Sequence, residues 1–334
     1  MKSDKENTPS PQSPVVSVLM PVYNTAPFVA EAIESILSQS FADFEFIIID
    51  DGSTDGSAQI VEQYAKQDCR IQFVSRGNRG CYQTRNEASS LSRGEFIAAM
   101  DSDDISLPER LALEVEYLRD HPECVAVGGW FLTVDPDGMP IRTICTPLTH
   151  EEIDAGHMRG SGGSLVQGTM MFRRDAYIKV GGYSGTHSTS EDMELCLRLA
   201  EVGRLANIPK IVLMYRRHLG SMSSAKREHQ RSNSLAIIRE AYSRRDLPFT
   251  LCPVTLHIPL TEAANQQTTW VYDALIGGHV ATARKHAWQS VRNHPLRPST
   301  WCALATACVV GRADRGLGKW LRMMKCLRII KRLP

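Results

Sequence analysis

The sequence predicts an α/β fold in which a mixed, mainly parallel sheet is flanked by helices. In the first hundred residues, short apolar strands alternate with segments of helical spacing, and polar clusters follow three of the strands. Such alternation is typical of parallel βαβ units with right-handed crossovers. With 334 residues and 43% hydrophobic content, the chain can bury a large core.

The first βα unit is predicted from residues 15–37. Residues 15–23 are apolar and rich in β-branched side chains, which indicates a buried strand that breaks at Asn24. Pro27 stands where a helix would begin, with Thr25 or Ala26 near its cap. Apolar residues then recur at helical spacing across 29–37, which predicts an amphipathic helix.

The same pattern continues to residue 104. Strands are predicted at 44–49, 70–75 and 96–100, with helices around 60–65 and 85–86 between them. Polar clusters lie at 23–24, 50–55 and 101–104, directly after three of the predicted strands. Because ligands collect beyond the carboxyl ends of parallel strands, we expect the three clusters to converge on one crevice.

The second half of the sheet is predicted to be mixed. In order, we expect a helix after Ser106 and Pro108, a hairpin of 124–134 and 139–144 with its turn at 135–138, a glycine-rich loop at 159–163, a strand at 165–172, a helix at 191–202 and a strand at 208–215.

Beyond residue 224 the pattern is helical. Helices are expected near 227–244, 261–276, 279–293, 299–310 and 317–332. We therefore divide the chain into a leader at 1–14, an α/β domain at 15–224 and a helical, basic extension at 225–334. The leader is polar and rich in Pro and Ser without an apolar core, so we expect a disordered segment and not a signal peptide.

Charge is divided unevenly along the chain. Residues 225–334 hold 18 Lys and Arg against 6 Asp and Glu, whereas residues 1–224 hold 20 against 31. Six basic and no acidic residues lie between 319 and 334, interleaved with large apolar ones. This composition fits an anchor at an anionic membrane surface. A solvated or packed terminal helix is the alternative, and we expect no nucleic-acid partner.

Composition excludes several other classes. No apolar run approaches the roughly 20 residues that a membrane-spanning helix needs. We therefore expect a cytoplasmic protein that is peripheral, at most, to the inner face of the membrane. The 9 cysteines are scattered and form no CxxC pair, so neither a disulfide framework nor a zinc site is indicated.

The acidic run at 101–104 is a candidate metal site. If the backbone stays extended there, Asp101 and Asp103 project from one face with their Cα atoms roughly 6.5 Å apart. Two carboxylates that close repel each other unless a cation lies between them. The alternative is a solvated acidic turn.

A second acidic run, at 51–62, matches the spacing of an EF-hand loop. We reject calcium binding there because the preceding residues predict a strand, whereas an EF-hand needs a helix. Asp50 and Asp51, at the end of that strand, are instead candidates to accept hydrogen bonds from a base or ribose.

Two segments near the C-terminal end of the α/β domain supply further candidate residues, at 191–192 and 216–218. Glu191 and Asp192 open a helix, where acids favourably meet the helix dipole, but Asp192 is also a candidate general base. His218 is either a structural loop histidine or a partner of Asp103 at the metal, since imidazole suits Mn²⁺. Arg216 and Arg217 could pair with phosphate oxygens.

Eight strings in order give the chain a family resemblance. They are MPVYN at 20–24, DDGSTD at 50–55, RGCYQTRN at 79–86, DSDD at 101–104, GTMMFRR at 168–174, GGY at 181–183, EDMELCLRLAEVG at 191–203 and YRRHLGSMS at 215–223. The chain resembles family 2 glycosyltransferases of the Rossmann-like GT-A fold over about residues 15–224. Thr84 departs from the alanine common in the family, and the loop at 160–163 is unusually rich in glycine.

The resemblance implies an inverting glycosyltransferase. It would move a hexosyl or N-acetylhexosaminyl group from a nucleotide-diphospho-sugar, usually a UDP-sugar, to a glycan or lipid-linked acceptor. A catalytically silent sugar-nucleotide-binding or scaffold protein on the same fold is the alternative. The implied nucleotide-sugar-binding residues are Pro21, Val22, Tyr23, Asn24, Asp50, Asp51, Arg85, Asp101, Ser102 and Arg216. The implied metal ligands for Mn²⁺ or Mg²⁺ are Asp103 and His218, and the implied catalytic carboxylates are Asp192, as general base, and Glu191.

Overall fold

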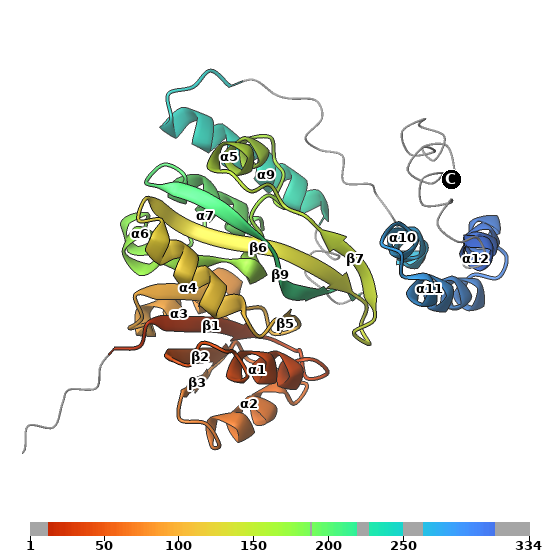
Figure 1. Ribbon diagram of the computed structural model, residues 1–334, viewed down its shortest axis with the longest axis horizontal. Helices are drawn as coiled ribbons and strands as arrows, with labels where there is room; N and C mark the ends of the chain where they lie inside the picture. Colours follow the sequence, from red (N-terminus) through yellow and green to blue (C-terminus); the bar gives the residue numbers. More distant parts are fainter. Residues whose placement is uncertain (1–12, 188, 219–226, 250–262, 311–334) are drawn as a thin grey trace, which may run out of the picture.

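The computed structural model describes residues 13–187, 189–218, 227–249 and 263–310 (Figure 1). Within them the strands are β1 Val16–Val22, β2 Phe44–Asp50, β3 Ile71–Ser75, β4 Phe96–Ala99, β5 Ile105–Ser106, β6 Cys124–Val134, β7 Pro140–Ile144, β8 Met171–Arg173 and β9 Arg204–Arg216. The helices of the α/β part are α1 Val29–Leu37, α2 Ser57–Ala65, α3 Cys81–Leu91, α4 Arg110–Asp120, α5 His150–Met158, α6 Arg174–Lys179 and α7 Glu191–Leu199.

The strands form one mixed sheet with the order β3-β2-β1-β4-β8-β6-β9-β5, and β7 pairs with β6. Strands β1 to β4 pair in parallel, as the alternating pattern predicts. From β8 onward the pairing is mixed, since β8 is antiparallel to both β4 and β6. The prediction of a mixed, mainly parallel α/β sheet with flanking helices is therefore confirmed.

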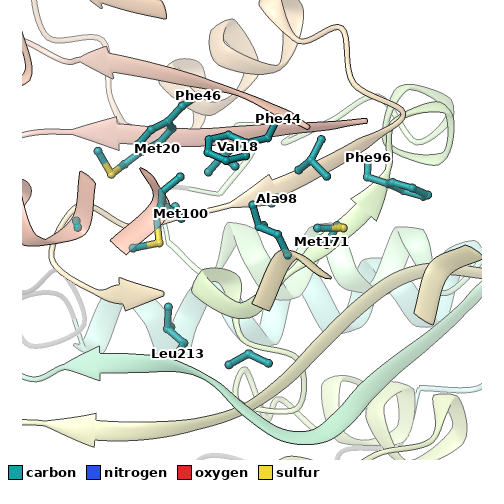
Figure 2. Close-up of a cluster of buried hydrophobic side chains, with 14 of the residues drawn as sticks. Val18, Met20, Phe44, Phe46, Phe96, Ala98, Met100, Met171 and Leu213 are labelled. Atoms are coloured by element: carbon teal, nitrogen blue, oxygen red, sulfur yellow. The ribbon is translucent and has the colours of Figure 1, made fainter. Parts of the chain in front are cut away.

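Alternate residues of the central strands face two separate cores. Val18 and Met20 of β1 join one cluster with α1 and α4, whereas Leu19 joins another with α3 and α7. Burial on both faces explains why these strands are apolar without interruption. Figure 2 shows the first cluster, in which Phe46, Ala98 and other apolar side chains of neighbouring strands gather.

Several predicted boundaries are wrong. The strand expected at 208–215 begins at Arg204, and the helix expected at 191–202 ends at Leu199. The strand expected at 165–172 is a short 3₁₀ helix, η1 Gln167–Thr169, followed by β8, and the Thr169 hydroxyl donates to the carbonyl of Val166 (2.8 Å). Helix α1 begins at Val29 and not at Pro27. The Thr25 amide instead donates to the Ser57 hydroxyl at the start of α2 (2.9 Å), and the Ala26 amide donates to the Asp55 carboxylate in the loop before it (2.9 Å), which holds both residues outside α1.

The chain beyond residue 224 is helical where the structure describes it. The helices are α9 Arg227–Arg244, α10 Ala263–Ile276, α11 Val280–Asn293 and α12 Pro298–Val310, close to the predicted ranges. Helices α10 to α12 share a hydrophobic cluster that includes Ile141 of β7, so they pack beside the β6–β7 hairpin (Figure 1). In the described ranges, no helix is long and apolar enough to cross a bilayer. The leader up to residue 12 and the basic segment at 319–334 lie outside the described residues.

Candidate active site

The end of β1 is tied to the loops that follow β2 and β4. Asn24 has a left-handed backbone with φ of 53°. Its side-chain oxygen accepts a hydrogen bond from the amide of Thr54 (2.8 Å). The Thr25 hydroxyl donates to the Ser102 hydroxyl (3.0 Å). The three polar clusters predicted from the sequence are therefore brought together at one edge of the sheet.

Asp50 ends β2 with its carboxylate buried. It accepts hydrogen bonds from the Ser53 amide (3.2 Å) and the Ser75 hydroxyl (3.0 Å). Asp50 thereby joins the end of β2 to the end of β3, and its contact with a nucleoside stays a prediction.

Asp51 follows β2 in the sequence, and its carboxylate lies at the N-terminus of α3. Its carboxylate accepts from the amides of Arg79 (2.8 Å) and Gly80 (2.9 Å) and pairs with the Arg76 guanidinium. These bonds hold the turn that leads into α3, whose first residue is Cys81. Burial raises the pKa of Cys81 to about 11, and the charges of Arg85, Glu191, Asp101 and Asp51 all act on this thiol. Asp51, from the motif after β2, therefore fixes the turn before the helix that carries Arg85.

The backbone at 101–104 turns and is not extended, so the predicted common face of Asp101 and Asp103 is wrong. The Asp104 amide donates to the Asp101 carbonyl (3.3 Å), which closes the turn. As a result the two carboxylates have different partners. Asp101 accepts from Arg85 (3.1 Å), and Asp103 lies 2.9 Å from the Nε2 atom of His218.

Arg85 joins the acidic turn to α7. Its guanidinium contacts Asp101 (3.1 Å) and Glu191 (3.4 Å), and its centre lies 5.4 Å from the centroid of the Tyr183 ring. Only 11% of its side chain is exposed. Burial raises the pKa of Asp101, while the Arg85 charge opposes that rise. Arg85 therefore keeps two carboxylates from different segments close together.

Asp192 lies in the first turn of α7, beside this ion-pair network. Burial raises the pKa of its carboxyl, and a hydrogen bond from the Met193 amide (2.8 Å) and the charge of Arg85 lower it. The charge of Asp101 raises it. A carboxylate with a raised pKa is a stronger base than one in water, which suits proton abstraction.

Helix α9 contacts the residues that precede Asp192. His187 lies 3.1 Å from the Glu240 carboxylate, and the Asn233 side chain donates to the Thr189 hydroxyl (2.9 Å). Ser190 adopts a left-handed backbone with φ of 63° directly before α7. The start of α7 is thus fixed by a helix that follows it in the sequence.

Asp103 and His218 form the candidate metal-binding pair. The ring of His218 also lies against Phe28, with their centroids 5.0 Å apart. In the part of the chain that the structure describes, no three His, Cys, Asp or Glu side chains are grouped to enclose a cation. A carboxylate with an imidazole nevertheless suits Mn²⁺, whose remaining ligands would come from phosphate oxygens and water. The buried Oδ2 atom of Asp104 has no hydrogen-bond partner among the described residues, and burial together with the charges of Asp103 and Asp101 raises the pKa of this carboxyl well above its usual value.

Arg216 is buried and its guanidinium has three partners within the protein, and its predicted contact with phosphate stays a prediction. It donates to the carbonyls of Asp103 (2.9 Å) and Pro136 (2.8 Å) and pairs with Glu31. Its backbone amide donates to Asp104 (2.8 Å). Arg216 therefore stabilises the acidic turn at 101–104 through Asp103 and Asp104, a role that the sequence did not reveal.

The end of β1 offers different groups to a ligand. Val22 is fully buried within the core, so it can reach a ligand only through its backbone. Tyr23 is 51% exposed, so its ring is accessible. Pro21, the residue of β1 before Val22, is partly buried.

Comparison with known proteins identifies the family of the chain. The model of glycosyl transferase family 2 matches residues 17–181. EpsE of Bacillus subtilis (strain 168), named as a glycosyltransferase, is 37% identical over 194 residues, which cover 57% of this chain and 68% of EpsE. The chain belongs to glycosyl transferase family 2. The predicted resemblance and the prediction of a glycosyltransferase are confirmed.

Solved structures of glycosyltransferases share the fold. Mannosyltransferase PcManGT from Pyrobaculum calidifontis, in complex with GDP-Man and Mn²⁺, has a TM-score of 0.52 at 17% identity and covers 95% of this chain and 87% of its own. TarS 1–349 of S. aureus, in complex with UDP-GlcNAc, has a TM-score of 0.55 at 18% identity and covers 89% and 91%. Both confirm the GT-A architecture of this family 2 chain.

Sequence reasoning missed one buried ion pair behind the site of this glycosyltransferase. Arg110 pairs with Glu114 (3.1 Å), and both side chains are fully buried. Arg110 also donates to the carbonyls of Ala99 (2.8 Å) and Met170 (3.2 Å), at the ends of β4 and η1. The available signal was an Arg and a Glu four residues apart on the inward face of a predicted helix.

Proposed function

We propose that the protein catalyses the inverting transfer of a sugar from a nucleotide-diphospho-sugar to a hydroxyl of a glycan or lipid-linked acceptor. The observation that carries the proposal is the bridge of Arg85 to Asp101 and Glu191, beside Asp192. It joins the motif after β4 to the start of α7, so a donor bound at the strand ends would lie next to a candidate base.

The donor is proposed to be a nucleoside diphosphate sugar, with uridine favoured. PcManGT holds GDP-Man and TarS holds UDP-GlcNAc on the same fold, so the fold accepts either base. On this chain the exposed ring of Tyr23, the backbone of Pro21 and Val22, and the side chains of Asn24, Asp50 and Asp51 are proposed to contact the nucleoside. Ser102, with the neighbouring turn, would face the ribose or sugar.

Asp103 and His218 are proposed to hold Mn²⁺ or Mg²⁺. Their side chains meet at 2.9 Å, and the Asp103 carbonyl is fixed by Arg216. When bound, the cation neutralises charge on the departing diphosphate as a Lewis acid. PcManGT was solved with Mn²⁺, which supports the choice of a divalent ion.

Asp192 is proposed to remove the proton from the acceptor hydroxyl. The resulting oxygen attacks the anomeric carbon from the side opposite the diphosphate, the bond from that carbon to the phosphate oxygen breaks, and the configuration inverts. Glu191 is proposed to act through Arg85, which it contacts at 3.4 Å. A positioned base typically contributes about 10²- to 10⁴-fold to the rate.

Residues 225–334 are proposed to place the enzyme at the inner face of a membrane. Their 18 basic and 6 acidic residues support attraction to anionic lipid. Sedimentation with liposomes that contain anionic lipid tests this. A chain that ends at residue 317 should remain in the supernatant while the full chain pellets, and equal partition of the two would contradict the anchor.

The enzymatic proposal is tested by release of nucleoside diphosphate from a panel of sugar nucleotides with Mn²⁺ and candidate acceptors. Asp192→Asn should lower turnover by about 10²-fold or more while nucleotide binding persists. Arg204→Gln, at an exposed ion pair with Glu151 on the surface, serves as the control. Turnover by Asp192→Asn equal to that of the unaltered enzyme would refute the assignment of the base.

A further inference from the structure

Helix α10 contacts the residue next to His218. The Arg217 guanidinium donates to the Asp273 carboxylate (2.8 Å) and lies 5.6 Å from the centroid of the Trp270 ring. The Arg217 amide donates to the carbonyl of Val134 in β6 (2.9 Å). Arg217 is thus held between the sheet and the helical extension.

Helix α11 contacts the same region through the turn of the β6–β7 hairpin. Asp135, fully buried in that turn, pairs with Lys285 and lies 2.9 Å from the Nε2 atom of His286. The next residue, Pro136, accepts a hydrogen bond from Arg216 (2.8 Å). Arg216 in turn donates to the carbonyl of Asp103 (2.9 Å), so a continuous set of contacts joins α11 to the candidate metal-binding carboxylate.

The interface between α10 and the β6–β7 hairpin is tightly packed. Trp270 of α10 is only 3% exposed and shares a hydrophobic cluster with Ile141 of β7. After α10, Gly277 lies so close to β7 that an added Cβ would be 2.3 Å from the Ile141 carbonyl oxygen. Such contact leaves little freedom for α10 to shift relative to the hairpin, since close-packed interiors resist displacement.

We propose that Asp273 and Asp135 are positioning residues, through which helices α10 and α11 hold His218 and Asp103 in the arrangement that binds the metal. Arg216 is the last residue of β9, and Arg217 and His218 directly follow it. Without Asp273, Arg217 keeps only its backbone bond and its contact with Trp270, and His218 gains freedom to turn away from Asp103. The extension is then a working part of the donor site, not a separate appendage. This inference rests on the metal role of His218 under the proposed function.

The experiment measures binding of Mn²⁺ to the full chain in the presence of uridine diphosphate, by the electron paramagnetic resonance signal of free Mn²⁺. Asp273→Asn should weaken Mn²⁺ binding by about tenfold, the usual size for a residue that orients a metal ligand. Asp273→Glu should restore much of the affinity. Glu201→Gln is the matched control, because Glu201 pairs with Arg244 of α9 (2.9 Å), away from residues 216–218.

Two further variants separate the possible failures. If His218→Ala binds Mn²⁺ as tightly as the unaltered chain, the metal role of His218 is wrong. If His218→Ala weakens binding while Asp273→Asn does not, this inference alone is overturned. Should Asp273→Asn fail to fold, Arg217→Gln removes the same ion pair from the other side and is expected to weaken Mn²⁺ binding equally; unchanged affinity in that variant would also overturn the inference.

Discussion

Replacing Arg85 by Gln should shift the pH dependence of turnover. Asp192 must be ionised to act as a base, and the positive charge of Arg85 favours the ionised form by lowering the pKa of that carboxyl. Removing the charge while keeping a polar side chain takes away one of the effects that oppose burial, and the hydrogen bond from the Met193 amide remains. The pKa of Asp192 therefore rises. As the pH is lowered, the variant loses activity at a higher pH than the unaltered enzyme does.

The size of the shift follows from the environment of Arg85. In proteins generally, an opposite charge within about 4–6 Å of a carboxyl lowers its pKa by about 1–3 units. Partial screening by solvent, together with the loss of the Arg85 bond that lowers the pKa of Asp101, reduces the net change. We expect the acid limb of the profile to move to higher pH by about one unit.

The assay is the initial rate of nucleoside diphosphate release at saturating donor, between about pH 5 and 9. Arg85→Lys, which keeps a positive charge, should hold the acid limb close to its original position even if the rate falls. Coincident acid limbs for Arg85→Gln and the unaltered enzyme would refute the claim that Arg85 controls the base.

Three other predictions concern stability. His157 is fully buried and its pKa is lowered to about 4, so stability present above pH 6.5 should fall by about 3 kcal/mol as the pH drops toward 4. Urea unfolding of His157→Phe should show a smaller loss over that range, and equal losses would contradict the cause. Gly277→Ala should lower the melting temperature by several degrees because its Cβ meets the Ile141 carbonyl, whereas Gly162→Ala, which meets nothing within 4 Å, should not; equal melting temperatures would show that the close approach is not needed. Arg110→Met should cost about 3 kcal/mol at pH 8 and less at pH 6, because the pKa of Glu114 is already raised to about 7 by burial and protonation neutralises the unpaired acid. A cost independent of pH would mean that lost packing dominates, and Glu114→Leu in the Arg110→Met background should recover stability.

Much of the α/β part could be predicted because its signals are local. Strands β1 and β2 are buried on both faces, so uninterrupted apolar runs mark them, and the polar residues that follow mark their carboxyl ends. That alone predicts where Asn24, Asp50 and Asp101 meet. Their convergence at one edge of the sheet needed no more than the parallel order of the strands.

The partners within the site could not be predicted because they depend on contacts distant in sequence. Asp101 and Asp103 were expected to share a cation, but the turn at 101–104 sends one toward Arg85 and the other toward His218. An Asp-Ser-Asp-Asp run is compatible with an extended or a turned backbone, and tertiary contacts decide between them. The bonds of Arg216 to the carbonyls of Asp103 and Pro136 join residues far apart in the sequence, so no local pattern reveals them.

In the helical extension too, the helices could be predicted from the sequence but their contacts with the α/β part could not. The ranges of α10 and α11 follow from helical spacing, whereas the ion pair of Arg217 with Asp273 joins residues 56 positions apart. The division of the chain at residue 224 stays a prediction, and the contacts of α10 and α11 with the β6–β7 hairpin argue that the two parts act together.

The anomalous scattering of Mn²⁺ in crystals grown with Mn²⁺ and uridine diphosphate tests the central claim most directly. The claim predicts one strong peak within bonding distance of both Asp103 and His218, next to the phosphates. A strong peak elsewhere, or phosphates bound far from the turn at 101–104, would contradict it.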